Sequence, residues 1–300
     1  MSSLFLFFID GLGIGARNSF NPFHDLDGAE PLAVFQDEEP QLPFDGKLVR
    51  TDACLGVEGR PQSASGQTTI LTGVNVPATL GFHKQGFPNE AMRAIIREHS
   101  IFLQLKRAGI TPNVFANAYT KRFFENRPRW TSATTTAVEA AEMSFRTIED
   151  LRNGQALYHD FTNKLLRETV EDKIELRTPE EGGAILARLA SRHRFTLYEY
   201  FITDKIGHAQ DKTAAQQVIL ELAAFVRSLL AHSDLARITV MLTSDHGNLE
   251  DLATRNHTLN LVPTIIWGAH RHSLATRIHD LADLTPAIID TLTRKEATVR

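Results

Sequence analysis

The chain has 300 residues and 42% of them are hydrophobic, which is enough for one large α/β domain or for a core domain with a smaller insert. The formal net charge of −4 and the isoelectric point near 6.3 argue against a nucleic-acid-binding surface. The one cysteine, Cys54, excludes an internal disulfide framework and predicts a reducing compartment, the cytoplasm.

The first predicted element is a buried strand over residues 4–9, which ends on Asp10. Its apolar run is too short to span a membrane. It also lacks the basic segment and the cleavage site of a signal peptide. We therefore expect a buried strand here and no association with a membrane.

Three glycines follow this strand, and they allow two interpretations. One is a dinucleotide-binding fingerprint. Against it, Asp10 would face the pyrophosphate, and no clear second strand ends in an acidic residue at the expected distance. We favour the other interpretation, in which Asp10 is a functional carboxylate and the glycines let the backbone pass close to a bound group.

Residues 61–73 (PQSASGQTTILTG) place small and hydroxyl side chains before an apolar run. This order is typical of a loop that enters a helix N-terminus, where unpaired N–H groups favour an oxyanion or a phosphate. A serine or threonine at this place is also the commonest kind of N-cap. The stretch alone leaves both roles open for Ser63, Ser65 and Thr68.

A helix is predicted at 101–108 and a strand at 112–118. After them, basic and aromatic residues come close together, and this change of composition indicates an insert. We predict a cap subdomain over residues 119–178, with residues 1–118 and 179–300 forming the core domain. The insert begins with basic and aromatic residues, which suit an anionic substrate. Arg127, Arg129 and His159 are its candidate substrate contacts, and an ordinary surface role is the alternative for each.

The last third of the chain alternates predicted helices, at 180–192, 216–230 and 283–292, with predicted strands. A strand at 195–202 precedes Asp204 and His208, whose spacing of four brings both side chains to one point if the loop turns helically. A strand that starts at Ile238 ends at Asp245 and His246. His257 lies in the polar loop before a strand at 264–267.

This alternation predicts a three-layer α/β/α core with a mostly parallel central sheet and helices on both faces. Ligand sites in such folds lie at the carboxyl ends of the strands. Three carboxylates and two imidazoles follow such ends, and His257 lies on a further loop. Together they are enough for two divalent cations, Mn²⁺ or Zn²⁺. With a serine at a helix N-terminus, they make up the parts of a two-metal phosphoryl-transfer site.

Four motifs carry a resemblance to a known family: residues 8–11 (FIDG), 204–208 (DKIGH), 245–248 (DHGN) and 257–263 (HTLNLVP). Their order resembles that of the alkaline phosphatase superfamily of metalloenzymes, with closest similarity to the cofactor-independent phosphoglycerate mutases and phosphopentomutases. The resemblance implies an alkaline phosphatase-like fold. It also implies two ligand groups, one of Asp204, His208 and His257 and one of Asp10, Asp245 and His246, the second of which also touches the nucleophile.

The resemblance also points to a nucleophile, because the attacking hydroxyl of the family lies ten residues before a glycine. Counting back from Gly73 gives Ser63, which would then be a metal ligand as well, with Ser65 and the pair Thr68–Thr69 as alternatives. Residues 64–66 (Ala, Ser, Gly) replace the acidic and histidine-containing run of the mutases, which argues against mutase activity more than against the metal site. The Pro and Arg pattern of sulfatases does not surround Ser63.

The expected function is phosphoryl transfer on a small phosphorylated metabolite through a phosphoserine, by a phosphomutase or a phosphatase. One metal would lower the pKa of the serine hydroxyl, and the other would hold the phosphate. Two other classes of function remain: a non-catalytic metal-binding protein whose insert binds a partner, and a nucleotide binder built on the glycines after Asp10.

Overall fold

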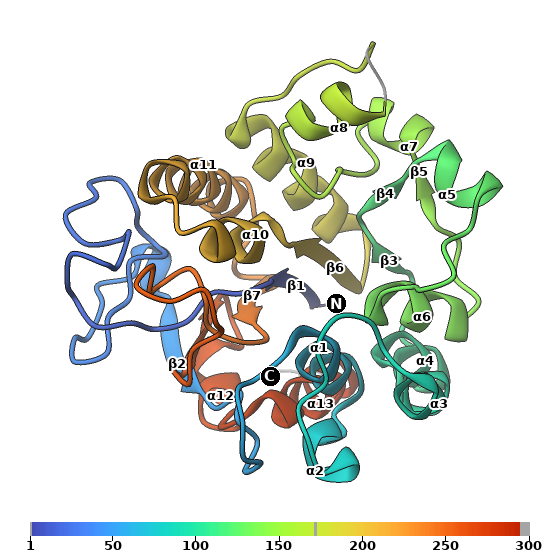
Figure 1. The fold of residues 1–300 in the computed structure, drawn as a ribbon. Coiled ribbons are helices and arrows are strands. Elements are labelled where there is room, and N and C mark those ends of the chain that lie inside the picture. The colour runs from blue at the N-terminus through green and yellow to red at the C-terminus, as the bar shows by residue number, and fades with distance from the viewer. Residues whose placement is uncertain (1, 171–172, 295–300) are drawn as a thin grey trace, which may run out of the picture.

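A six-stranded sheet organises the computed structural model, which describes residues 2–170 and 173–294. The sheet has the strand order β2-β8-β7-β1-β6-β3. Figure 1 shows β1, β6 and β7 side by side at its centre. The strands are β1 (Ser3–Ile9), β2 (Lys47–Thr51), β3 (Asn113–Phe115), β6 (Phe195–Tyr200), β7 (Ile238–Ser244) and β8 (Val262–Trp267).

The sheet is mostly parallel, as predicted. Strands β3, β6, β1 and β7 run in one direction, while β8 is antiparallel to β7 and β2 is antiparallel to β8. In register, Ile9 pairs with both Tyr200 and Ser244, so three parallel strands end at the same edge. Because β8 is reversed, its first residue lies at this edge too, and the loop before it returns to the same place.

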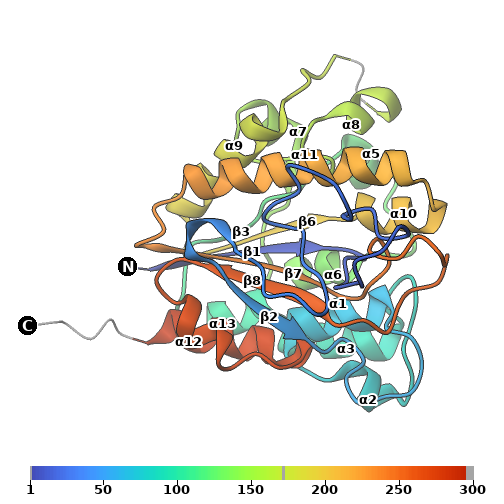
Figure 2. The ribbon, with the colours of Figure 1, turned by 90° about the vertical axis from the view of Figure 1, so that its left-hand side faces the viewer.

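Helices cover both faces of the sheet, which confirms the three-layer α/β/α fold (Figure 2). Alternate residues of β1 enter two separate cores: Phe5, Phe7 and Ile9 pack in one, and Leu4, Leu6 and Phe8 in the other. Burial on both faces explains the unbroken apolar run of this strand. One face carries α9 (Pro179–Arg192) and α11 (Lys212–Ala231), and the other carries α1 (Ser63–Thr72), α3 (Glu90–His99), α4 (Ile101–Arg107), α6 (Ala133–Ala140) and α13 (Leu284–Thr293).

Helix α11 is long and apolar enough to cross a membrane by length and composition alone. Half of that apolar window is buried inside the fold, and α11 packs along α9. This is the pattern of a core helix.

The region predicted as a cap contains a two-stranded sheet of β4 (Ala118–Tyr119) and β5 (Arg146–Thr147), with helices α5 (Lys121–Glu125), α7 (Ile148–Arg152) and α8 (Lys164–Thr169). A small apolar cluster holds it together: Ala118, Ile148, Leu151, Ala156, Leu166 and Ile174. Helix α6 belongs to the same sequence region, but it packs against α1, α3 and α4 in the main core. The cap and its bounds of 119–178 stay a prediction.

The remaining helices are short and connect these layers. They are α2 (Val76–Leu80), α10 (Ile202–Ala209), α12 (Arg271–Ala275) and the 3₁₀ turns at Pro43–Asp45 and Leu281–Asp283. The strand predicted over 195–202 ends at Tyr200, and α10 begins two residues later. Asp204 and His208 therefore lie on a helix, one turn apart.

Candidate metal centre

Three buried ligand side chains gather where β1 and β7 end. Asp10 follows β1, and Asp245 and His246 follow β7. The Nε2 atom of His246 lies 3.2 Å from Oδ1 of Asp10 and 3.6 Å from Oδ2 of Asp245. Ligand atoms of all three residues lie within 4.8 Å of one another, close enough to hold one cation.

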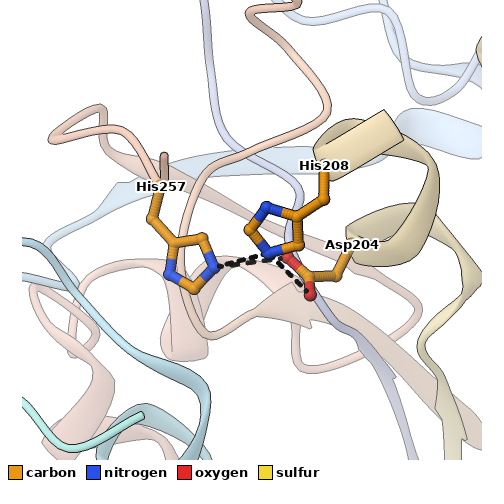
Figure 3. Close-up of side chains that lie close together, drawn as sticks. All are labelled: Asp204, His208 and His257. Carbon is orange, nitrogen blue, oxygen red and sulfur yellow. Dashed lines mark hydrogen bonds and ion pairs between the residues drawn. The ribbon is translucent and has the colours of Figure 1, made fainter. Parts of the chain in front are cut away.

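A second ligand group lies beside it on other segments (Figure 3). Asp204 and His208 come from α10, and their side chains approach to 3.4 Å. His257 comes from the loop before β8, and its Nε2 atom lies 3.4 Å from Asp204 and 3.2 Å from Nε2 of His208. The rings of His246 and His257 stack with centroids 3.7 Å apart, so the two groups adjoin.

Backbone carbonyls orient two of these imidazoles. The Nδ1 atom of His257 lies 2.9 Å from the carbonyl oxygen of Pro61, and that of His208 lies 2.6 Å from the carbonyl oxygen of Arg255. A proton on Nδ1 is donated to the carbonyl, which leaves Nε2 as the free acceptor. In both residues Nε2 faces the other ligands, as metal-binding histidines require.

Ser63 is the first residue of α1 and lies against the Asp10, Asp245 and His246 group. Its Oγ atom is 3.0 Å from Nε2 of His246. The alternative hydroxyls are engaged elsewhere: Ser65 bonds to the Gln62 carbonyl and to the backbone of Lys84, and Thr68 and Thr69 bond back to carbonyls of their own helix. Of the four candidates, Ser63 is the one that the structure brings to the ligands.

Gly66 lets α1 approach the end of β7 this closely. A Cβ atom on Gly66 would lie 2.9 Å from the carbonyl oxygen of Asp245, a distance that Cβ atoms do not adopt. One turn after Ser63, Gln67 faces the same way, and its amide donates hydrogen bonds to Asp10 (3.0 Å) and Asp245 (3.2 Å). Gln67 thus bridges the two buried carboxylates.

The charges of the Asp10, Asp245 and His246 group fit a divalent cation. Burial, and then the charge of Asp10, raise the pKa of Asp245 well above its ordinary value. The Oδ1 atom of Asp10 is buried and faces Nε2 of His246. Two desolvated carboxylates and an imidazole form an oxygen and nitrogen donor set that suits Zn²⁺ or Mn²⁺.

The protonation of the two groups differs. Burial disfavours a charged His246, but the carboxylates of Asp245 and Asp10 outweigh it and raise its pKa to about 10. Burial also opposes the charge of Asp204, yet hydrogen bonding to His257 and the nearby imidazoles lower its pKa to about 2. A cation that binds at His246 must therefore displace a proton from it.

Glu250 ties together the loops that carry the ligands. Its carboxylate is buried and accepts hydrogen bonds from the backbone N–H groups of Gly13 (2.9 Å) and Asn248 (2.7 Å). It also accepts from the side chains of Thr258 and Asn260, in the loop that carries His257. Sequence reasoning missed both Gln67 and Glu250. The four-residue spacing from Ser63 is a signal that could have found Gln67, whereas nothing in the sequence marks Glu250.

Ser63 lies where two hollows meet. One, the cationic hollow, encloses about 900 Å³ and is lined by Arg60, Lys84 and Arg255 together with the Asp204, His208 and His257 group. The other, the aromatic hollow, encloses about 550 Å³ and is lined by Asp10 and Gln67 as well as by aromatic rings.

The predicted substrate contacts are placed differently. His159 lines the aromatic hollow. Arg127 and Arg129 line a separate hollow, where Arg127 pairs with Glu139, and the structure does not bring them to Ser63.

Residues 168–296 match the model of the Metalloenzyme superfamily. The 2,3-bisphosphoglycerate-independent phosphoglycerate mutase of Moorella thermoacetica is 27% identical over 130 residues, which are 41% of this chain and 25% of that protein. The phosphopentomutase of Alkaliphilus metalliredigens is 23% identical over 94% of this chain and 73% of its own length. The predicted resemblance to this superfamily of metalloenzymes is confirmed.

The fold agrees with these metalloenzymes. A cold-active alkaline phosphatase from a Shewanella species superposes with a TM-score of 0.53 at 10% identity, covering 97% of this chain and 99% of that one. The match to the phosphoglycerate mutases is partial, since the chain spans about a quarter of their length. The similarities imply divalent metal ions, and the two ligand groups are the candidate places for them.

Proposed function

We propose that this protein transfers the phosphoryl group of a small phosphomonoester through a phosphoserine at Ser63, with the help of two divalent cations, Mn²⁺ or Zn²⁺. The observation that carries the proposal is the place of the Ser63 hydroxyl. It lies 3.0 Å from His246, at the start of α1, and it lines the same hollow as Asp204, His208 and His257. A purely structural metal site has no need of a hydroxyl there.

Each ligand group would hold one of the two cations. Asp204, His208 and His257 would hold one ion, and Asp10, Asp245 and His246 would hold the other, with Ser63 beside it. When bound, the cations supply positive charge that lowers the pKa of the serine hydroxyl and offsets the charge of the phosphate.

The chain's own residues account for the rest of the reaction. The Ser63 hydroxyl gives up its proton to solvent and its oxygen attacks phosphorus in line. The new bond to phosphorus forms as the bond to the leaving oxygen breaks, and the leaving oxygen takes up a proton from solvent. The positive end of the α1 dipole favours the anion held at this helix terminus. Water then removes the phosphoryl group in a phosphatase, or a hydroxyl of the substrate accepts it in a mutase.

The test combines metal content with turnover of p-nitrophenyl phosphate in the presence of Mn²⁺ or Zn²⁺. We expect two ions per chain, and a loss of turnover of at least about 1,000-fold in Ser63→Ala with the metal content retained. Ser65→Ala is the matched control, because that hydroxyl bonds to the backbone and not to the ligands. A screen of phosphorylated sugars and glycerates, scored for phosphate and for isomerised product, separates phosphatase from mutase.

Two results would contradict the proposal. Two bound ions without turnover of any phosphomonoester would favour a non-catalytic metal-binding protein whose insert binds a partner. A protein that binds no metal and turns over no phosphomonoester would exclude two-metal phosphoryl transfer.

A further inference from the structure

Aromatic rings from separate segments surround the aromatic hollow beside Ser63. They belong to Phe87, Phe115, Tyr119, Phe123, Tyr158, His159 and Phe201. Ser63, Asp10 and Asp204 line the same hollow, so the rings begin where the proposed chemistry takes place. A substrate bound at Ser63 has this wall within its reach.

Two of these rings keep much of their surface in water. Phe87 is 51% exposed and Phe201 is 40% exposed. Exposed apolar surface costs about 25 cal/mol per Å² relative to burial, so a flat apolar ligand gains free energy by covering both rings. Rings that converge on a reactive group are the usual lining of a small-molecule site.

His159 offers this ligand a hydrogen bond. Its ring lies between those of Tyr158 and Phe201, with centroid distances of 4.0 and 4.2 Å. Its Nε2 atom is buried, and among residues 2–170 and 173–294 no group is recorded as its hydrogen-bond partner. Burial, and then the charge of Lys205, lower the pKa of His159 to about 4, so the ring is neutral at neutral pH. A buried imidazole nitrogen is unfavourable unless water or a ligand satisfies it, and a ligand in this hollow can take the place of the water.

The charges of the aromatic hollow do not suit a second anionic group. Glu199 places a nearly buried carboxylate in its wall, and among the described residues that line it Lys205 brings the one basic side chain other than His159. The cationic hollow on the other side of Ser63 has Arg60, Lys84 and Arg255 instead. An uncharged ring is the group that fits the aromatic side.

We propose, on the basis of the phosphoryl-transfer function above, that the aromatic hollow binds the organic part of the substrate. The substrate is then a phosphomonoester that carries an uncharged aromatic ring, stacked on Phe87 and Phe201, with a hydrogen-bonding group that reaches Nε2 of His159. Phosphorylated sugars and glycerates lack such a ring and leave these surfaces uncovered.

Matched substrates test this inference. Benzyl phosphate and ethyl phosphate have similar leaving groups and differ in the ring, and we expect kcat/KM to be at least about tenfold higher for benzyl phosphate. Benzylphosphonate should likewise inhibit at least about tenfold more strongly than methylphosphonate, which measures binding without turnover. Ribose 5-phosphate and 3-phosphoglycerate serve as polar competitors.

Two variants test whether Phe87 and Phe201 cause the preference for benzyl phosphate. Phe87→Ala and Phe201→Ala should each lower the ratio of benzyl to ethyl kcat/KM by about tenfold. Phe82→Ala is the control, because Phe82 is 48% exposed but does not line the hollow, and it should leave the ratio unchanged.

The two proposals fail in distinguishable ways. An active enzyme whose benzyl to ethyl ratio is near one, or that prefers the polar phosphates, would overturn the aromatic substrate and leave the phosphoryl-transfer function standing. A metal-loaded protein that turns over no phosphomonoester would overturn both.

Discussion

Substitution of a single aspartate in each ligand group tests which residues hold which of the two ions. Asp245 is fully buried and serves the group next to Ser63, whereas Asp204 serves the other group. We expect Asp245→Ala to release the ion next to Ser63 first and to leave the Asp204, His208 and His257 site better occupied. Metal content per chain, measured during stepwise chelation, checks this. Asp204→Ala should show the reverse order, and equal loss of both ions in either variant would refute the division.

The ionisation of the Glu199 carboxyl makes the stability of the folded protein depend on pH. Burial comes first among the causes that raise the pKa of Glu199 to about 7, with the charge of Asp10 adding to it. Because the carboxyl of an unfolded chain ionises near its ordinary value, about 4.3, ionisation costs the folded state free energy as the pH rises from about 4 to 7. The Glu199→Gln variant avoids this cost.

We therefore expect Glu199→Gln to stabilise the metal-free protein by on the order of 3 kcal/mol at pH 8 and by little at pH 5. Urea unfolding in the presence of a chelator measures both values. Glu98→Gln, at a side chain that is 73% exposed, should show no such pH dependence. A gain in stability that is the same at both pH values would mean that the charge of Glu199 is not its cause.

The sequence predicted most of the candidate metal centre from residue type alone. Asp and His at the tips of strands are costly unless they bind something, and this physical argument pointed to Asp10, Asp204, Asp245 and the histidines beside them. Gln67 and Glu250 act through partners that are far away in the sequence, 57 residues and 237 residues from Asp10 and Gly13. Such contacts have no local pattern. For the same reason, sequence could not decide that His159 lines the hollow beside Ser63 and that Arg127 and Arg129 line another one.

Among the structural elements, the loops at the carboxyl ends of the strands depend on one buried side chain. The Glu250 carboxylate accepts from two backbone N–H groups with one oxygen and from Thr258 and Asn260 with the other. In Glu250→Gln an NH₂ group faces one of these pairs of donors, which then lose their acceptor. We expect a loss of about 2–4 kcal/mol in the free energy of unfolding.

The same change should weaken the metal site that includes His257, because Thr258 is its neighbour in the chain. Thermal unfolding and metal titration of Glu250→Gln measure both effects. Asp251→Asn makes the same chemical change one residue later, where the side chain accepts a hydrogen bond from the backbone N–H of Ala253 that an asparagine can also accept, and serves as the control. A variant within about 0.5 kcal/mol of the wild type would show that these loops are held in another way.

Helices and strands were predictable where their apolar period is clear. The buried strand at β1 and the long helix α11 are examples. Helix α3 was missed, although Asn89 caps it and Met92 and Ile96 repeat at helical spacing. The end of β6 was placed too late, because Phe201 and Ile202 continue the apolar run while Ile202 already begins α10. The antiparallel direction of β8 follows from chain connections that no local pattern shows.

Across the whole molecule, bound cations should stabilise the fold, because both ligand groups join distant segments. A ligand at 100 times its Kd adds about 2.7 kcal/mol per site to the free energy of unfolding. We expect a chelator to lower Tm by roughly 5–10 °C, and Mn²⁺ or Zn²⁺ to restore it. Differential scanning fluorimetry measures the shift. A double variant, Asp204→Ala with Asp245→Ala, should not respond, and an unchanged Tm of the wild type would speak against metal bound in these groups.

The central place of β1 has a consequence for synthesis on the ribosome. This strand is made early, yet its two neighbours in the sheet, β6 and β7, begin at Phe195 and Ile238. At about 5–20 residues per second, an apolar strand waits roughly 10–40 s for its first partner. During that time both of its edges can pair with other chains. We therefore expect the nascent chain to fold in higher yield when a chaperone covers β1 during this interval.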